Sequence, residues 1–374
     1  MATDRGVQSG FLVLADITGY TVFLTENELE HAQGIIEDLT RAILAALTPS
    51  LTLVKLEGDA VFAHAPDGRL SGDCILDLVE RAYCDFADSR DDMERLTTCT
   101  CSACTNIPSL DLKFVVHHGE YVTHRVAGAE DLAGPDVILV HRLLKNGVCE
   151  ATGHRAYALI TEPATATVPG LELTGHTEHV HEFGAVASSV LDLEASLRRI
   201  RDSRRVSVEA SDCDFVYRMH LPVKPAEAWE WWTNPALVPQ WQKDVVGQRL
   251  DRRGGGRRGT GASIHCAHGG YETLARFLDW RPFEYYTAER TPLNKHFKAP
   301  PPLTETVEFV PREDGGTDVE YRCRMHTRNV KARLEFLIGR PFATRQFRKN
   351  ECALQALLAA KPDAQEDAGR AAGG

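Results

Sequence analysis

The alternation of apolar and polar positions in the first half of the chain predicts strands and helices in a regular order. An apolar run from Phe11 ends on an acid, Asp16, and breaks at Gly19. Apolar residues then recur at helical spacing from Leu29 to Leu47, which indicates a helix packed on a sheet. The expected elements are a strand at 11–16, a helix at 25–48, strands at 51–55 and 60–65, a helix at 73–95, a strand at 110–122 and a helix at 134–145. Strand–helix–strand–strand–helix–strand is the ferredoxin-like order, so we expect an α+β fold.

The second half has a different pattern, with several short strands and one long helix at its end. Positions alternate from Phe215 to Leu221, and Lys224-Pro225 then opens a short helix. Two further strands flank the glycine-rich run at 254–261, and Asp314-Gly-Gly is expected to form a hairpin turn. The remaining strands are expected at 271–277, 285–290, 304–310 and 317–326, before a helix at 329–358 that is interrupted near Pro341.

The length of the chain predicts two domains. Its 374 residues exceed one ordinary domain. The basic polar run at 198–205, RRIRDSRR, is interpreted as the linker. The expected domains therefore span 1–197 and 206–361, and a disordered tail is expected at 362–374.

Composition and charge narrow the function classes. The net charge of −11 at pH 7 argues against nucleic-acid binding. No apolar run reaches the length that spans a bilayer, and the beginning, MATDRGVQSG, lacks the apolar segment of a secretory signal. We therefore expect a cytoplasmic protein without a transmembrane segment. Its ten cysteines are then expected to be mostly reduced thiols or metal ligands.

Two acids of the first domain are candidates for a metal site. Asp16 closes the first strand, and Asp59 follows the turn at Gly58 in the sequence VKLEGDAVFA. A hairpin tip beside the end of a neighbouring strand brings two carboxylates close together, where Mg²⁺ offsets their repulsion. The alternative is that Asp16 caps the following turn and that Asp59 simply occupies the hairpin.

Four segments in order resemble the motifs of class III nucleotidyl cyclases. They are ADITGYT, KLEGDAVFA, LKFVVHHGEYV and DLAGPDVILVHRLLKNG, and the resemblance covers residues 8–190. It implies a ferredoxin-like cyclase domain that converts ATP to cyclic AMP and pyrophosphate with two Mg²⁺ or Mn²⁺ ions. The segment CTCSACTNI, before the third motif, resembles an uncharacterised bacterial subgroup of cyclase-like proteins.

The resemblance also implies roles for individual residues. The metal ions would bind at Asp16, Ile17 and Asp59. The nucleotide-binding residues would be Thr18, Gly19 and Tyr20 at the phosphates, and Lys55 and Asp131 at the adenine base. Lys55 is otherwise a surface lysine of a strand, and Asp131 a loop acid.

One departure from the cyclase pattern concerns the transition state. Arg142 matches the arginine that steadies it, but the asparagine expected four residues earlier is Ile138. Losing that hydrogen bond removes on the order of 2–4 kcal/mol of transition-state stabilisation. Either His141 or another polar group compensates, or turnover is slow, or the domain only binds nucleotide. Because the sites of this family lie between two subunits, the resemblance implies a homodimer.

Three cysteines in six residues, Cys99, Cys101 and Cys104, form a second candidate metal site. Thiolates suit a soft metal, and Zn²⁺ is the natural choice in the cytosol. We take His117 as the fourth ligand, with His118 and Cys84 as alternatives. The other interpretation is a trio of reduced loop cysteines or a redox pair.

The second domain resembles the START-like (SRPBCC) superfamily in the segments VKPAEAWEWWTNPALVPQW, LDWRPFEYYT and TVEFVPREDGGTDVEYR. The resemblance implies a helix-grip fold with an apolar cavity for a hydrophobic small molecule or lipid. Trp229, Trp232, Trp241 and Phe336 are the candidate lining residues, and the alternative is that they fill the core. The whole chain is thus expected to be a cyclase regulated by a hydrophobic ligand, or a degenerate cyclase scaffold whose activity is ligand binding.

Overall fold

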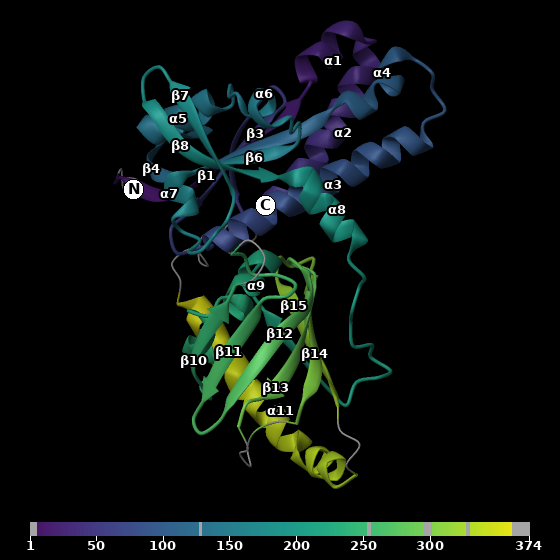
Figure 1. Cartoon of the computed structure of the whole chain (residues 1–374), viewed down its shortest axis with the longest axis vertical. Helices are drawn as coiled ribbons and strands as arrows, with labels where there is room; N and C mark the ends of the chain where they lie inside the picture. The colour runs from purple at the N-terminus through teal and green to yellow at the C-terminus, as the bar shows by residue number, and fades with distance from the viewer. Residues whose placement is uncertain are drawn as a thin grey trace. The chain divides into compact units, whose positions relative to one another are not determined.

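The chain divides into two compact units, Met1–Ser203 (unit 1) and Arg204–Gly374 (unit 2). The computed structural model describes residues 6–126, 129–252, 256–294, 299, 301–326 and 330–360. The tail predicted at 362–374 lies outside the described residues. Each unit is a mixed α/β structure with its own sheet (Figure 1).

Unit 1 follows the expected order of strands and helices, with short additions. Its elements are β1 (Gln8–Thr18), α1 (Tyr20–Glu26), α2 (Leu29–Leu47), β2 (Thr52–Glu57), β3 (Ala60–Pro66), α3 (Gly72–Leu96), α4 (Ser102–Thr105), η1 (Ile107–Ser109), β4 (Asp111–Val126), β5 (Ala129–Ala133), α5 (Pro135–Leu143), α6 (Val148–Thr152), β6 (Tyr157–Thr161), α7 (Glu162–Thr165), β7 (Thr174–Val180), β8 (Gly184–Asp192) and α8 (Leu193–Asp202).

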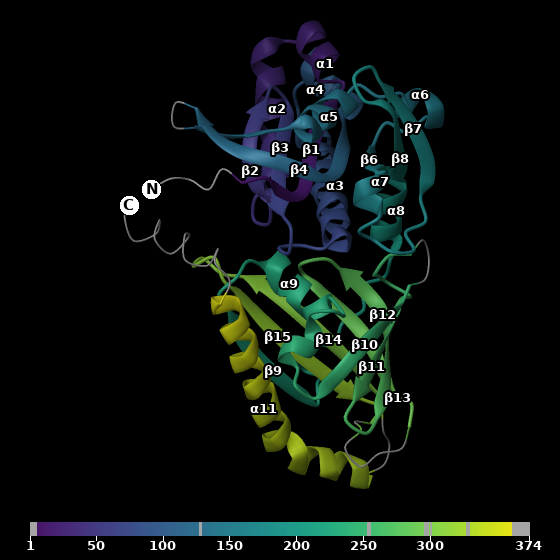
Figure 2. The ribbon, with the colours of Figure 1, turned by 90° about the vertical axis from the view of Figure 1, so that its left-hand side faces the viewer.

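Strand β1 lies between β3 and β4 in the unit 1 sheet, whose strand order is β2-β3-β1-β4-β6-β8-β7, with β5 paired to β4 outside this order. It pairs antiparallel with β3 and β4, and both its faces are covered, so Gly10–Ala15 and Ile17 are buried. Leu12 and Leu14 pack with Val140 and Leu143 of α5, while α2 and α3 lie against β3 and β4 (Figures 1 and 2). Because strand side chains alternate, Asp16 continues the row that faces α5.

The boundary between the two units falls within the predicted linker at 198–205, and residues 198–202 of that segment belong to helix α8. Asp192 caps this helix by accepting a hydrogen bond from the Ala195 amide, 2.9 Å away. Arg199 pairs with the buried Glu80 of α3 at 3.0 Å. The basic residues therefore hold α8 against α3 instead of forming a solvated connection.

Unit 2 is built on a seven-stranded antiparallel sheet, in the order β10-β11-β12-β13-β14-β15-β9. Its elements are β9 (Phe215–Leu221), α9 (Pro225–Thr233), α10 (Val238–Trp241), β10 (Val245–Asp251), β11 (Ser263–His268), β12 (Glu272–Arg281), β13 (Tyr285–Pro292), β14 (Leu303–Pro311), β15 (Thr317–Met325) and α11 (Val330–Ala359).

The core of unit 2 is rich in aromatic side chains. Trp229 of α9 is fully buried, and its ring meets the edges of Trp280 and Phe309 at centroid distances of 4.7 and 5.2 Å. Helix α11 packs against β9 and α10. It is one helix from Val330 to Ala359 with Pro341 inside it, but its axis bends along its length (Figure 2), so the proline does not end the helix. Within the described parts of the chain, no helix combines the length and apolar character needed to cross a bilayer.

Candidate functional site

The two acids at the end of β1 and at the β2–β3 turn lie next to each other. The Ile17 amide donates a hydrogen bond to Asp59 Oδ2 at 3.2 Å, which places the Asp59 carboxyl against the end of β1. Partial burial and the neighbouring Asp16 carboxylate raise the pKa of Asp59 to about 7. Gly58 has φ of +66°, a backbone conformation that favours glycine and lets the turn present Asp59.

A lysine that sequence reasoning missed offsets part of this negative charge. Lys113 of β4 is the cross-strand partner of Asp16, and its Nζ lies 3.1 Å from Asp16 Oδ2. The same Nζ donates to the Leu144 carbonyl at the end of α5, also at 3.1 Å. The alternation of β4 could have indicated the face on which Lys113 lies, but not its partner.

The donor set at this position fits a hard divalent cation. Two carboxylates and the backbone of Ile17 supply oxygen ligands, which Mg²⁺ and Mn²⁺ prefer. Thr18, two residues after Asp16 on the same side of the strand, has a buried Oγ1 without a hydrogen-bond partner among the described residues. Lys113 supplies a single positive charge, so the pair of acids still has unbalanced charge when both are ionised.

The second predicted group, Lys55 and Asp131, is also brought together. Lys55 Nζ lies 3.2 Å from Asp131 Oδ2 and 3.0 Å from Glu57 Oε1. His141 Nδ1 lies 3.2 Å from Glu57 Oε2, and burial lowers the pKa of His141. Lys55 and Asp131 therefore present a hydrogen-bond donor and an acceptor side by side at a half-buried position. In this structure the two side chains form an ion pair with each other.

Of the other predicted residues, Arg142 makes its contact elsewhere, and Tyr20 lies just past the end of β1. Arg142 is exposed and pairs with Glu182 of the β7–β8 hairpin at 3.0 Å. Tyr20 begins α1, and Gly19 precedes it with φ of +93°. The Ile17 amide, next to the residues expected at the phosphates, donates its hydrogen bond to Asp59. Within one chain the arginine is not directed at the two acids.

The three cysteines meet a histidine that was not predicted. His31 Nδ1 lies 3.2 Å from Cys101 Sγ, 3.8 Å from Cys99 Sγ and 4.0 Å from Cys104 Sγ. The prediction of His117 as fourth ligand is wrong, because His117 is buried in the sheet with Nδ1 2.7 Å from Thr161 Oγ1. His31 lies in α2, some seventy positions before the cysteines, and no local sequence signal connects the two segments.

Unit 2 contains a cavity of about 260 Å³ between the sheet and the helices. Trp232 and Phe336 line it as predicted, but Trp229 and Trp241 do not. These two tryptophans are buried in the core, where Trp241 Nε1 donates to the Trp231 carbonyl at 3.0 Å. Helical spacing alone did not distinguish the face of α9 that borders the cavity from the face that fills the core.

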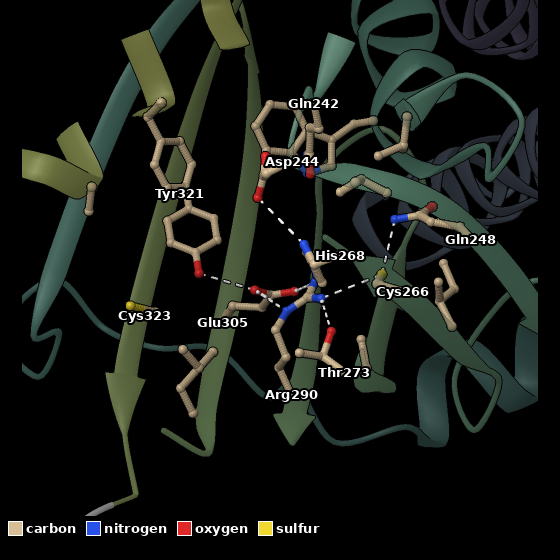
Figure 3. A pocket seen from close by; sticks show the side chains of 18 of the residues that line it. Gln242, Asp244, Gln248, Cys266, His268, Thr273, Arg290, Glu305, Tyr321 and Cys323 are labelled. Carbon is tan, nitrogen blue, oxygen red and sulfur yellow. Dashed lines mark hydrogen bonds and ion pairs between the residues drawn. The ribbon is translucent and has the colours of Figure 1, made fainter. Parts of the chain in front are cut away.

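An ion pair that sequence reasoning missed lies on the sheet wall of this cavity (Figure 3). Arg290 Nη2 lies 2.6 Å from Glu305 Oε1, and Tyr321 donates its hydroxyl to Glu305 Oε2 at 3.1 Å. Arg290 also donates to Thr273 Oγ1 at 3.1 Å. Figure 3 shows Gln248 and His268 at the same cavity, and Gln248 Oε1 is buried without a partner among the described residues.

Part of unit 1 matches a family model, and part of the chain is similar to a curated protein. Residues 36–152 match the family described as "Protein of unknown function (DUF2652)". The chain is 41% identical over 98 residues to the "Uncharacterized protein Rv2561/Rv2562" of Mycobacterium tuberculosis. This match covers 26% of the chain and 46% of that protein, so the chain spans less than half the length of this relative.

Solved structures similar to the chain include nucleotide cyclases. A bacterial light-regulated adenylyl cyclase is 14% identical with a TM-score of 0.39, covering 54% of this chain and 58% of that chain. The adenylyl cyclase CyaB from P. aeruginosa is 17% identical with a TM-score of 0.36, covering 50% and 95%. The guanylyl cyclase Cya2 is 13% identical with a TM-score of 0.37, covering 50% and 94%.

Proposed function

We propose that unit 1 is a class III nucleotidyl cyclase-like domain that binds ATP with two divalent cations and cyclises it slowly. The observation that carries the proposal is the contact between two carboxyl groups, Asp16 and Asp59, at the ends of neighbouring strands. Mg²⁺ or Mn²⁺ bound there would hold the phosphates of the nucleotide and lower the pKa of its 3′-hydroxyl. The 3′-oxygen would then bond to the α-phosphorus as the bond from phosphorus to pyrophosphate breaks, and the hydroxyl proton would pass to water.

The pair of Lys55 and Asp131 supports adenine as the base. The lysine Nζ can donate to a ring nitrogen, and the carboxylate can accept from an exocyclic amine. Guanine presents an oxygen where adenine presents the amine, so the carboxylate would meet an acceptor and disfavour it. Lys55 and Asp131 must give up their ion pair to bind the base. We therefore expect a moderate affinity for the nucleotide.

A homodimer is part of this proposal. Arg142 faces Glu182 in its own chain, so a catalytic role for Arg142 requires a site completed by a second copy. Strand β2 is an edge strand of the sheet and exposes Leu53 and Leu56, and α5 exposes Ile138. Exposed apolar side chains on an edge strand are suited to an interface between subunits.

The test is ATP binding and cyclic AMP formation with Mn²⁺, comparing the wild type with Asp59→Asn. The wild type should bind Mn²⁺–ATP and form cyclic AMP, and Asp59→Asn should lose at least about tenfold in affinity for the metal–nucleotide complex. Asp38→Asn is the matched control, since Asp38 is an exposed carboxylate of α2 that pairs with Arg41. ATP binding without any product would leave a non-catalytic nucleotide-binding domain, and no binding would overturn the proposal.

For unit 2 we propose a START-like domain that binds a hydrophobic small molecule or lipid carrying a polar group. An antiparallel sheet, the helices that follow its first strand, the long terminal helix and the cavity of about 260 Å³ support this second function. Trp232 and Tyr286 belong to the cavity lining and are joined by a 2.9 Å hydrogen bond, so an occupant should change tryptophan fluorescence.

The cavity proposal is tested by native mass spectrometry and by extraction of the purified chain with organic solvent. A copurifying apolar molecule in the wild type, reduced in an Ala275→Trp variant that fills the cavity, supports it. Regulation of unit 1 by such a ligand stays a prediction. It is tested by measuring ATP turnover before and after extraction, and equal rates would contradict it.

A further inference from the structure

The cysteine–histidine cluster, defined as His31, Cys99, Cys101 and Cys104, has the arrangement of a four-ligand metal site. Its four ligand atoms all lie within 4.8 Å of one another. Tetrahedral zinc with Zn–S of about 2.3 Å and Zn–N of about 2.0 Å separates nitrogen from sulfur by roughly 3.5 Å. The three distances from His31 Nδ1, 3.2, 3.8 and 4.0 Å, bracket that value.

Hydrogen bonding alone does not explain this convergence. A ring nitrogen donates or accepts a single hydrogen bond, but three sulfurs surround Nδ1 of His31. Three thiols are also weak donors and acceptors, so they gain little from one imidazole. A cation at the centre satisfies all four atoms at once, and thiolates with an imidazole favour Zn²⁺ over Mg²⁺ or Ca²⁺.

The segments that carry the ligands are fixed to each other by further hydrogen bonds. The Glu28 carboxylate, at the start of α2, accepts from the Ser102 hydroxyl at 2.8 Å and the Ala103 amide at 3.1 Å. The Cys104 amide points to Cys101 Sγ at 3.5 Å, as an N–H···S contact within the Cys-x-x-Cys turn. Asn106 donates to Asn27 Oδ1 at 2.9 Å.

We propose that His31, Cys99, Cys101 and Cys104 bind one structural Zn²⁺ ion. Four protein ligands close the coordination sphere, as in structural rather than catalytic zinc sites. The ion would join the first turn of α2 to the segment before β4, which are 68 to 73 positions apart in the chain. Helix α1 follows the Asp16–Ile17 end of β1 and leads directly to α2, so the ion would fix the far end of α1.

The first experiment measures zinc in the full chain purified without chelator. One equivalent is expected for the wild type, and His31→Asn and Cys104→Ser should each lose most of it. The matched controls are His181→Asn and Cys352→Ser, because both residues are exposed and lie outside the cluster. Asp59→Asn should keep its zinc, which separates this site from the one proposed for nucleotide.

The second experiment does not depend on the variants folding. Zinc is removed from the wild type under reducing conditions and replaced by Co²⁺, whose thiolate charge-transfer and tetrahedral ligand-field absorption should appear and saturate at one equivalent. Zinc below about a tenth of an equivalent together with no such Co²⁺ spectrum overturns the proposal. A disulfide within the trio in freshly purified protein, detected by mass spectrometry, would also overturn it and favour a redox role.

Discussion

Ile138 is the residue at which the chain departs most clearly from the cyclase pattern. It lies on α5 between the buried Val137 and Leu139, and 52% of its surface is exposed. A polar residue at such a position costs little folding free energy, because no core contact is lost. A change in activity on substitution can therefore be assigned to chemistry.

We predict that Ile138→Asn raises the rate of cyclic AMP formation on the order of 10²–10³-fold, because an amide can hydrogen-bond the ribose in the transition state. The measurement is product formation from Mn²⁺–ATP at saturating nucleotide. Ile138→Ala removes the same side chain without supplying an amide, so it should keep the wild-type rate. Equal rates for the two variants would contradict the assigned role.

The Arg290–Glu305 pair predicts a strong effect on the stability of unit 2. Glu305→Gln leaves the Arg290 guanidinium without its charged partner on the cavity wall, and Glu305 is only 3% exposed. Loss of one partner of such a pair should lower the free energy of unfolding by about 3 kcal/mol.

The control for this prediction lies on the same sheet. Glu289→Gln removes the partner of Arg276 in an exposed pair at 3.9 Å, which should cost less than about 0.5 kcal/mol. Denaturant unfolding followed by tryptophan fluorescence measures both variants. An equally small effect of Glu305→Gln would contradict the prediction, and would mean that water in the cavity solvates the unpaired Arg290.

At the scale of elements, strand β3 carries a titratable group that makes the stability of unit 1 depend on pH. His64 Nδ1 lies 3.0 Å from the Tyr121 hydroxyl, and burial lowers the pKa of His64 to about 4. Between pH 6.5 and 4 the unfolded chain binds the proton and the folded chain does not. The contribution of neutral His64 to the free energy of unfolding is therefore fully present above pH 6.5 and is lost as the pH falls toward 4.

We predict that His64→Gln loses this pH dependence, because glutamine reaches Tyr121 without titrating. Relative to the variant, the wild type should lose at most about 1.4 kcal/mol per pH unit below pH 6.5. Chemical unfolding of the whole chain is followed at several pH values by circular dichroism, which reports both units, and by tryptophan fluorescence, which reports unit 2 alone. The difference between wild type and variant should appear only in the circular dichroism. Tyr121→Phe should lower the free energy of unfolding by a similar amount at every pH. Parallel pH profiles of the free energy of unfolding for wild type and His64→Gln would refute the assignment to His64.

The elements also determine which site residues could be predicted from the sequence. Asp16 and Asp59 were predictable as neighbours because Asp16 lies near the end of β1 and Asp59 lies in the turn before β3, the strand that pairs with β1. His31 was not predictable, because its contact with Cys101 depends on how α2 packs beside a segment that follows α3. Trp229 and Trp232 differ only in which face of α9 meets the cavity, which tertiary packing decides.

At the scale of the whole molecule, the five tryptophans give unit 2 a fluorescence signal of its own. All of them, from Trp229 to Trp280, belong to unit 2. Tryptophan fluorescence therefore follows unit 2 alone, whereas far-ultraviolet circular dichroism follows both units.

We predict that removing zinc lowers the melting temperature of unit 1 by about 5–10 °C and leaves that of unit 2 unchanged. A metal that joins distant segments acts like a crosslink worth a few kcal/mol, and each kcal/mol shifts the midpoint by about 2–4 °C in a unit of this size. Chelator should shift the circular dichroism transition but not the fluorescence transition. A matching fluorescence shift would argue against a site confined to unit 1.

Lys113 occupies a position that a divalent cation binding to Asp16 must compete for. Its ammonium group is the counter-ion of Asp16 and also donates a hydrogen bond to the carbonyl of Leu144, the residue after α5. A divalent ion that takes over Asp16 competes with that ammonium, so loading is an exchange of one positive group for another and weakens as monovalent salt rises. Binding of the ion would therefore change the hydrogen bond at the C-terminal end of α5, the helix that carries His141 and Arg142.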